Sequence, residues 1–399
     1  MSVVGYAPAP ATGRHGWHLG GLGLVAFAHG VSDFYSGMVP FVVFFVVTRD
    51  HISPVYQGAL GFLWYLTSSI VQPAFGAYAD RHGRWWFLPA SVALTACAVS
   101  VLGVAPGLIA PAALIVIGGL GSAIMHPEAG KYSAMLSGER KAAGISIFQI
   151  GGQLGFSLGP AIVAFLLARF AGPGMLVLLV PGAIAVAALF ATMRRLDRSA
   201  VRAHRASAPA DGLTRPVDRL GVGLLVGATA LRYLATASFM TYLPNLLVSR
   251  GASLAAAGRF VTLFLIVSAV GLLLGGYLAD RFGARLTSIA SLAFGAFSIF
   301  GFFIVPGIGG DVCLLGASVL LAVQNAPGVA LVQAMLPRNL GMALGLMNGV
   351  AFGIGSAMVT VVGIGVARFG AAGALETIGV VPLAAALSFA LARTPKLAR

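Results

Sequence analysis

The chain has 399 residues, of which 58% are apolar and 9% are charged, and its mean hydropathy is +0.94. In soluble domains about a quarter of all residues are charged, so this composition excludes a soluble enzyme and favours a helical membrane protein. The formal charge of +14 is then explained by membrane topology and by attraction to anionic lipid headgroups, and nucleic acid is not an expected partner.

Apolar runs between charged, proline and glycine breaks predict twelve transmembrane helices. The first six lie near residues 19–46, 55–79, 86–105, 109–135, 141–168 and 174–193. The second six lie near 219–248, 255–279, 287–306, 312–336, 341–367 and 372–392. We therefore expect an all-α membrane protein with two six-helix bundles, at 19–195 and 218–393. A cytoplasmic linker at 196–217 joins them, and tails at 1–18 and 394–399 complete the chain.

The distribution of lysine and arginine predicts the orientation of these helices. With the N-terminus inside, eighteen Lys and Arg residues fall in inner loops and tails. Only four fall in outer loops: Arg49, Arg169, Arg250 and Arg368. Because positive residues are retained on the cytoplasmic side, this bias predicts that both termini are cytoplasmic.

Short motifs return at a nearly constant offset between the two halves. GAYADRHGR at 76–84 returns as GYLADRFGAR at 276–285, which places Asp80 and Asp280 at an offset of 200. Pro127 returns as Pro327 at the same offset, and the triplet ARF at 168–170 returns at 367–369. These matches predict two parallel repeats related by an axis along the membrane normal.

Two of these patterns are similar to motifs of the major facilitator superfamily. The loop after the second span resembles its G-x-x-x-D-R-x-G-R motif through five residues: Gly76, Asp80, Arg81, Gly83 and Arg84. Asp280 and Arg281 belong to the weaker copy in the second half. The fifth span resembles the antiporter motif of drug-efflux members through three residues: Gly155, Gly159 and Pro160. Close packing of two helices explains that last pattern equally well.

Three longer blocks resemble the fosmidomycin resistance protein family within that superfamily. They are AHGVSDFYSGMVP at 28–40, SAIMHPEAGKYSAM at 122–135 and SIFQIGGQLGFSLGP at 146–160. The resemblance implies a monomeric pump of the bacterial inner membrane that needs no cofactor. It also implies efflux by proton antiport of a small polar or anionic compound such as fosmidomycin, a phosphonate. Proton-coupled uptake of an organic anion stays open, and an intramembrane enzyme or a transport-inactive receptor is the alternative from another class.

Of the eleven acidic residues, nine sit in loops or near the ends of predicted spans, and only Asp33 and Glu128 remain inside the bilayer. An anion at that depth costs about 3 kcal/mol or more, so both are candidates for proton coupling. His29 lies one turn before Asp33 on the same helical face, where the two can share a proton. Lys131 follows Glu128 at i+3, so a local ion pair is an alternative to a relay role for Glu128.

His126 completes the predicted proton-coupling set, because the fourth span has no arginine of the kind that superfamily members use there. It lies about 200 degrees around the helix from Glu128, so the two are not expected to hold one small ligand. The triplet of His126, Pro127 and Glu128 also lacks the spacing of a zinc site, and no metal is predicted.

Arg232 is the only deep cation of the second half, near the depth of Asp33 in the first. A guanidinium there suits bidentate capture of a phosphonate, phosphate or carboxylate, and pairing with Asp33 across the halves is the competing role. The other residues predicted to bind substrate are amides and tyrosines of the spans: Gln149, Gln153, Asn325, Asn348, Tyr35 and Tyr233.

Overall fold

The computed structural model describes residues 18–72, 74, 75, 78, 84–137, 141–204, 218–336, 343 and 345–392, and every regular element within them is helical. Proline and glycine interrupt several helices rather than ending them, which is tolerated in membranes because neighbouring helices satisfy the freed backbone groups. Pro40, Pro127, Pro160 and Pro244 all lie inside long helices.

The first half runs from α1 to α7. Its elements are α1 (Leu19–Arg49), α2 (Pro54–Tyr65), the π-helical turn η1 (Leu66–Ile70), α4 (Phe87–Leu102), α5 (Ile109–Leu136), α6 (Lys141–Phe170), the 3-10 turn η2 (Gly172–Leu178) and α7 (Leu179–His204). Helix α7 continues eleven residues past the end predicted at 193, into the stretch predicted as a linker. Residues 205–217 of that stretch lie outside the described residues.

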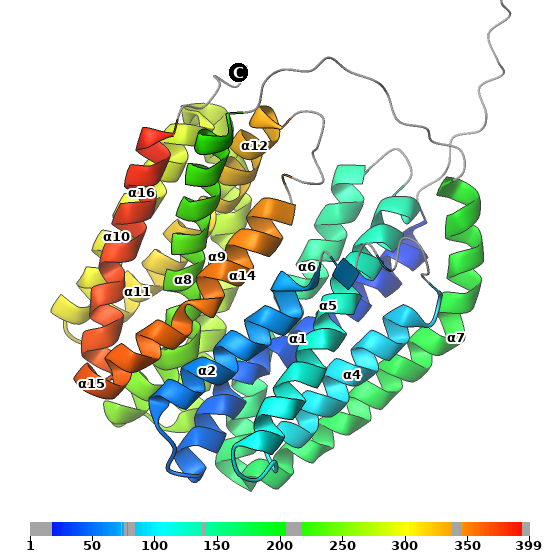
Figure 1. Cartoon of the computed structure of the whole chain (residues 1–399), viewed down its shortest axis with the longest axis horizontal. Helices are drawn as coiled ribbons and strands as arrows, with labels where there is room; N and C mark the ends of the chain where they lie inside the picture. The colour runs from blue at the N-terminus through cyan, green and yellow to red at the C-terminus, as the bar shows by residue number, and fades with distance from the viewer. Residues whose placement is uncertain are drawn as a thin grey trace, which may run out of the picture.

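The second half runs from α8 to α16. Its elements are α8 (Arg219–Ser249), α9 (Leu254–Phe282), α10 (Ala284–Ile304), α11 (Ile308–Val323), α12 (Asn325–Met335), η3 (Gly345–Val350), α14 (Ala351–Ala357), α15 (Val359–Thr377), η4 (Ile378–Val380) and α16 (Val381–Leu391). Figure 1 shows the two halves as two bundles side by side.

Nine stretches of the described residues are long and apolar enough to cross a bilayer. The longest, Gly345–Leu391, is broken at Gly370, whose φ of 73° is not helical, so it covers two predicted spans. The shorter apolar helix Phe87–Leu102 and the run formed by α2 and η1 occupy two further predicted positions. The described helices are therefore consistent with twelve spans.

The repeat extends to the backbone. Helices α1 and α8 are both 31 residues long and begin 200 residues apart. The side chains of His18 and Asp218 each cap their helix by accepting a hydrogen bond, at 3.0 Å, from the amide three residues on. Gly107 and Gly307 have nearly equal φ values of 63° and 64°. Equivalent turns thus have equivalent conformations, as expected of a duplicated bundle.

The two halves contact each other mainly away from the end that carries the linker. We call the end where α7 finishes and α8 begins the linker end, at the top of Figure 1, and the opposite end the distal end. Helix α2 packs on α15 and helix α6 packs on α9. Among the described residues, the hydrogen bonds between the halves lie at the distal end or at mid-depth.

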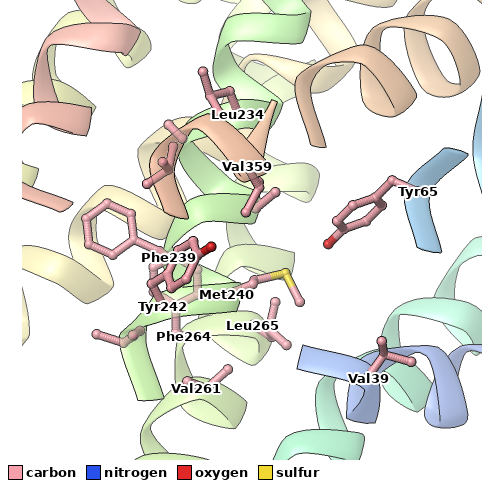
Figure 2. Close-up of a cluster of buried hydrophobic side chains, with 14 of the residues drawn as sticks. Val39, Tyr65, Leu234, Phe239, Met240, Tyr242, Val261, Phe264, Leu265 and Val359 are labelled. Carbon is pink, nitrogen blue, oxygen red and sulfur yellow. The ribbon is translucent and has the colours of Figure 1, made fainter. Parts of the chain in front are cut away.

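An apolar cluster reinforces this junction. Figure 2 shows Val39 and Tyr65 of the first half on one side, and Met240, Tyr242 and Val359 of the second half on the other. All five side chains are at most 5% exposed. Since lipid is as apolar as these side chains, close packing rather than the hydrophobic effect holds the halves together here.

Glycines set how closely α1 and α6 approach each other. A Cβ at Gly155 would collide with the carbonyl of Gly30, and a Cβ at Gly159 would lie 2.6 Å from the carbonyl of Phe34. The following Pro160 lies against Gly258 of α9. The predicted motif thus packs α6 against both α1 and the second half, which is the packing explanation that the sequence left open.

Candidate functional site

A cluster of two histidines and an aspartate lies at mid-depth in the first half. The Nε2 atom of His29 is 3.1 Å from one carboxylate oxygen of Asp33, and the Nε2 atom of His126 is 3.4 Å from the other. His29 and Asp33 lie one turn apart on α1, whereas His126 comes from α5, which packs on α1. The side chains of His29, Asp33 and His126 are 5%, 16% and 28% exposed.

Backbone carbonyls fix the other nitrogen of each ring. The Nδ1 atom of His29 lies 2.8 Å from the carbonyl of Phe148, and the Nδ1 atom of His126 lies 2.8 Å from the carbonyl of Ser122. Because a carbonyl can only accept, we assign a proton to each Nδ1. The ring of His29 also stacks on Phe148 at 4.0 Å, in space that a side chain at Gly152 would fill.

The tautomer of each histidine determines where the cluster can hold protons. In the neutral tautomer with a proton on Nδ1, each Nε2 carries only a lone pair. A lone pair facing an ionised carboxylate is repulsive, so each Nε2 to Asp33 contact becomes a hydrogen bond only when it holds a proton. The cluster therefore has places for up to two protons between its three side chains.

Glu128 lies outside this cluster, as its position on the helix predicts. One of its oxygens is 3.9 Å from Nζ of Lys131, and its side chain is 1% exposed. The ion pair that the i+3 spacing allowed is thus formed, at a long distance. Burial of the carboxylate makes such a partner valuable, because a buried anion needs compensation.

Arg232 lies at mid-depth of α8 and is 4% exposed. Its guanidinium stacks on the ring of Tyr233 at 3.8 Å, and Tyr233 contacts Phe352 at 4.9 Å. Its Nε and Nη2 atoms are buried and have no hydrogen-bond partner among the residues that the structure describes. The competing role of Arg232, pairing with Asp33, is not formed in this conformation, where Asp33 is engaged by the two histidines of its own half.

Phe352 links this stack to the first half. Its ring also contacts Tyr65 of α2 at 5.4 Å, so an aromatic chain runs from Tyr65 through Phe352 and Tyr233 to Arg232. Within the described part of the chain, Arg232 is therefore a buried cation with two unpaired donor groups beside the junction between the halves. Such a group is suited to bind an oxyanion.

The other residues predicted to bind substrate have diverse environments. The Nε2 atom of Gln153 donates to the carbonyl of Leu265 at 3.3 Å, across the junction. Gln149 is exposed and Asn325 is half-buried at the start of α12. The side chain of Asn348 lies outside the described residues.

Tyr35 is a buried residue of α1. It is 1% exposed, and its hydroxyl donates to the carbonyl of Leu178 at 2.5 Å, inside the first half. In this conformation the Tyr35 hydroxyl meets Leu178 of η2 and lies beside Gly182 of α7, and its role in substrate binding stays a prediction.

The loop motif is described only in part. Gly76, Asp80, Arg81 and Gly83 lie outside the described residues, and Arg84 is an exposed residue just before α4. In the second copy Asp280 and Arg281 are exposed at the end of α9. Gly283 ends that helix with a φ of 88°, a conformation that glycine adopts without strain. The neighbouring Arg285 donates to the carbonyls of Phe389 and Ala390, which ties α10 to α16.

Sequence reasoning missed an amide pair at the distal end. Gln57 is fully buried, and it bonds both Asn245 and the carbonyl of Thr241 in the second half. Gln324, also fully buried, donates to Thr229 at 3.2 Å. An amide side chain within an apolar helix was the available signal in the sequence, since buried amides need hydrogen-bond partners on neighbouring helices.

The sequence model described as Major Facilitator Superfamily matches residues 23–222 and 225–399. The chain belongs to this superfamily. It is therefore a secondary transporter of the multi-pass membrane type, and not an enzyme.

Two curated relatives cover nearly the whole chain. The Fosmidomycin resistance protein of Escherichia coli (strain K12) is 26% identical over 369 residues, which is 91% of this chain and 89% of the relative. The uncharacterized MFS-type transporter YfnC of Bacillus subtilis (strain 168) is 28% identical over 391 residues, which is 94% of this chain and 93% of the relative.

Solved transporters share the fold at lower identity. A bacterial homolog of the human lysosomal transporter Spinster, in an inward-facing and occupied conformation, superposes with a TM-score of 0.79 at 16% identity, covering 94% of this chain and 97% of the other. The D-xylose-proton symporter superposes with a TM-score of 0.68 at 18% identity, covering 95% and 98%. These comparisons confirm the expected all-helical fold and the family resemblance.

Proposed function

We propose that the protein exports a small polar or anionic compound in exchange for protons. The observation that carries this proposal is the placement of two groups at equal depth in different halves. In the first half, His29 and His126 each contact Asp33 at a distance where a proton can be shared. In the second half, Arg232 has donor groups that are unpaired among the described residues and suit an anion. Similarity to the Fosmidomycin resistance protein supports efflux and makes fosmidomycin the first substrate to test.

The distribution of lysine and arginine supports an orientation for the proposed cycle. With both termini cytoplasmic, the distal end is the outer face, and this conformation is closed on that side. Protons then enter the cluster after the distal junction opens, and they leave it toward the cytoplasm. Because Arg232 has no direct contact with Asp33, the coupling passes through the arrangement of the two halves, as alternating access requires.

We further propose a bacterial inner-membrane location, a monomer as the working unit, and two bundles divided between α7 and α8. The repeat of caps and turns at a constant offset supports this division. Each bundle carries one of the two charged sites, so a single chain contains everything that the cycle uses.

Inverted membrane vesicles with an acidic lumen test the exchange. Adding fosmidomycin to vesicles that contain the protein should release luminal protons, which an acridine dye detects. Asp33→Asn should abolish that release while the protein still reaches the membrane. The proposal is wrong if the variant and the wild type release protons equally at every pH tested.

The same vesicles decide between efflux and proton-coupled uptake of an organic anion. Antiport dissipates the gradient as substrate enters the vesicle, whereas symport moves substrate and protons in the same direction. Uptake remains the second candidate because a buried arginine recognises an anion equally well in either direction.

A further inference from the structure

The cluster of His29, Asp33 and His126 contains three side chains of metal-ligating type. One ligand atom of each lies within 4.8 Å of those of the other two. We propose that this cluster binds a divalent transition-metal ion, with Zn²⁺ preferred, and that the ion excludes protons from it. The binding site rests on geometry alone, and its effect on transport rests on the proposed function.

The distances fit a zinc site after a small adjustment. Zinc lies about 2.0–2.1 Å from imidazole nitrogen and carboxylate oxygen, so two ligands of a tetrahedral site are about 3.4 Å apart. The two histidine to Asp33 distances are 3.1 and 3.4 Å. These two contacts are made to different oxygens of the carboxylate, and the single ligand atoms of the three residues all lie within 4.8 Å of one another. Binding through one oxygen of Asp33 therefore requires rotation of the carboxylate and of a histidine ring, which shortens the distances that exceed about 3.4 Å.

The hydrogen-bond partners of the two histidines are of the kind found beside metal-binding histidines. A histidine that binds a metal through Nε2 generally donates its Nδ1 proton to a carbonyl or carboxylate, which orients the ring. Both rings already do so, to Phe148 and to Ser122. Both Nε2 lone pairs consequently point at the carboxylate, and a cation placed between them removes the repulsion that protons otherwise relieve.

The donor set selects the class of ion. Two imidazoles and one carboxylate suit Zn²⁺ and other divalent first-row transition-metal ions, whereas Ca²⁺ and Mg²⁺ require oxygen ligands. His126 is 28% exposed, which leaves room for a water molecule as the fourth ligand. All three ligands belong to α1 and α5, so the ion would not tether the two halves to each other. It would act by occupying the places of the exchanged protons.

Cobalt provides a direct test on the purified, untagged protein in detergent. Co²⁺ should bind with a stoichiometry of one, should give the visible absorption bands of a four- or five-coordinate ion, and should be displaced by Zn²⁺. His126→Gln and Asp33→Asn should each weaken Co²⁺ binding more than about 100-fold, since the loss of a residue that only hydrogen-bonds a metal ligand already costs about 10- to 100-fold. Size-exclusion profiles establish that the variants are folded.

His51→Asn is the matched control. His51 lies in the loop after α1 with a φ of 52°, which asparagine tolerates, and this substitution should leave Co²⁺ binding unchanged. Equal Co²⁺ binding by the wild type, His126→Gln and Asp33→Asn would overturn the proposal, as would the absence of a stoichiometric site in the wild type.

The metal site and the proposed exchange can fail separately. Proton release in the vesicle assay is measured with a chelator present, so it does not depend on metal. If Co²⁺ binds but fosmidomycin releases no protons, the site stands and the proposed function fails. If protons are released but Co²⁺ does not bind, the proposed function stands and the metal site fails.

Discussion

Gln57 and Asn245 exchange two hydrogen bonds across the junction between the halves. The Nε2 atom of Gln57 donates to Oδ1 of Asn245 at 3.0 Å, and Nδ2 of Asn245 donates to Oε1 of Gln57 at 3.1 Å. Gln57 also donates to the carbonyl of Thr241 at 2.7 Å. These bonds exist only while the distal end is closed, so they stabilise one state of the transport cycle relative to the other.

Removing this pair should open the distal end. Gln57→Ala deletes about three bonds at roughly 0.5–1.5 kcal/mol each, partly offset by resolvation of the freed groups, so we expect a shift of ten-fold or more toward the open state. Spin labels at Leu108→Cys and Ile308→Cys, both exposed at the distal end, report the separation of the halves. Cys97 and Cys313 are replaced beforehand.

Ser249→Ala is the control for that measurement. Its hydroxyl donates to the carbonyl of Leu246 within α8, so its loss should leave the distance distribution unchanged. An unchanged distribution for Gln57→Ala as well would mean that the apolar cluster, and not the amide pair, holds the distal end shut.

Gly155→Ala should destabilise the first half. The new Cβ would meet the carbonyl of Gly30 on α1. A backbone atom cannot relieve this clash by changing rotamer, as a side chain could. We expect overpacking to cost about 1–3 kcal/mol, seen as a lower melting temperature in detergent. Gly223→Ala on α8 meets nothing within 4 Å and should be neutral or stabilising. Equal melting temperatures for the two variants would contradict this account of the motif.

Arg232→Met separates a binding role from a structural one. Burial of two unsatisfied donors costs about 1–3 kcal/mol, while the stack on Tyr233 contributes about 0.5–2 kcal/mol. The ligand-free variant should therefore melt at the same temperature as the wild type or higher, yet lose all stabilisation by fosmidomycin. Arg259→Met, at an exposed position of α9, should keep that stabilisation. A large loss of stability without ligand would indicate a structural arginine.

Asp50 should contribute to stability in a pH-dependent way. A hydrogen bond from Arg49 lowers the pKa of Asp50 below its ordinary value, and Arg49 also donates to the carbonyls of Gly103 and Ala105. A depressed pKa means that the contribution is present at neutral pH and is lost as the pH falls through the range where Asp50 takes up a proton. Because the pair is partly exposed, Asp50→Asn should cost less than about 1 kcal/mol at pH 7. A melting difference that grew toward acidic pH would contradict this sign.

Local sequence rules predicted part of the site and could not predict the rest. The spacing of His29 and Asp33 puts both on one face of α1, and their contact follows from helix geometry alone. His126 joins them from α5, and its distance to Asp33 depends on how α5 rotates and slides against α1. No metal is predicted from the sequence, because the grouping of these three side chains arises only when α5 packs on α1.

Composition, charge bias and the 200-residue offset by themselves determined that this is a duplicated helical membrane protein, because a bilayer demands apolar spans and internally satisfied backbones. Only the tertiary structure decided which polar side chains meet. Tyr35 turns to the carbonyl of Leu178 and Arg232 stacks on Tyr233, since the facing of each helix is set by packing against neighbours that lie far away in the sequence.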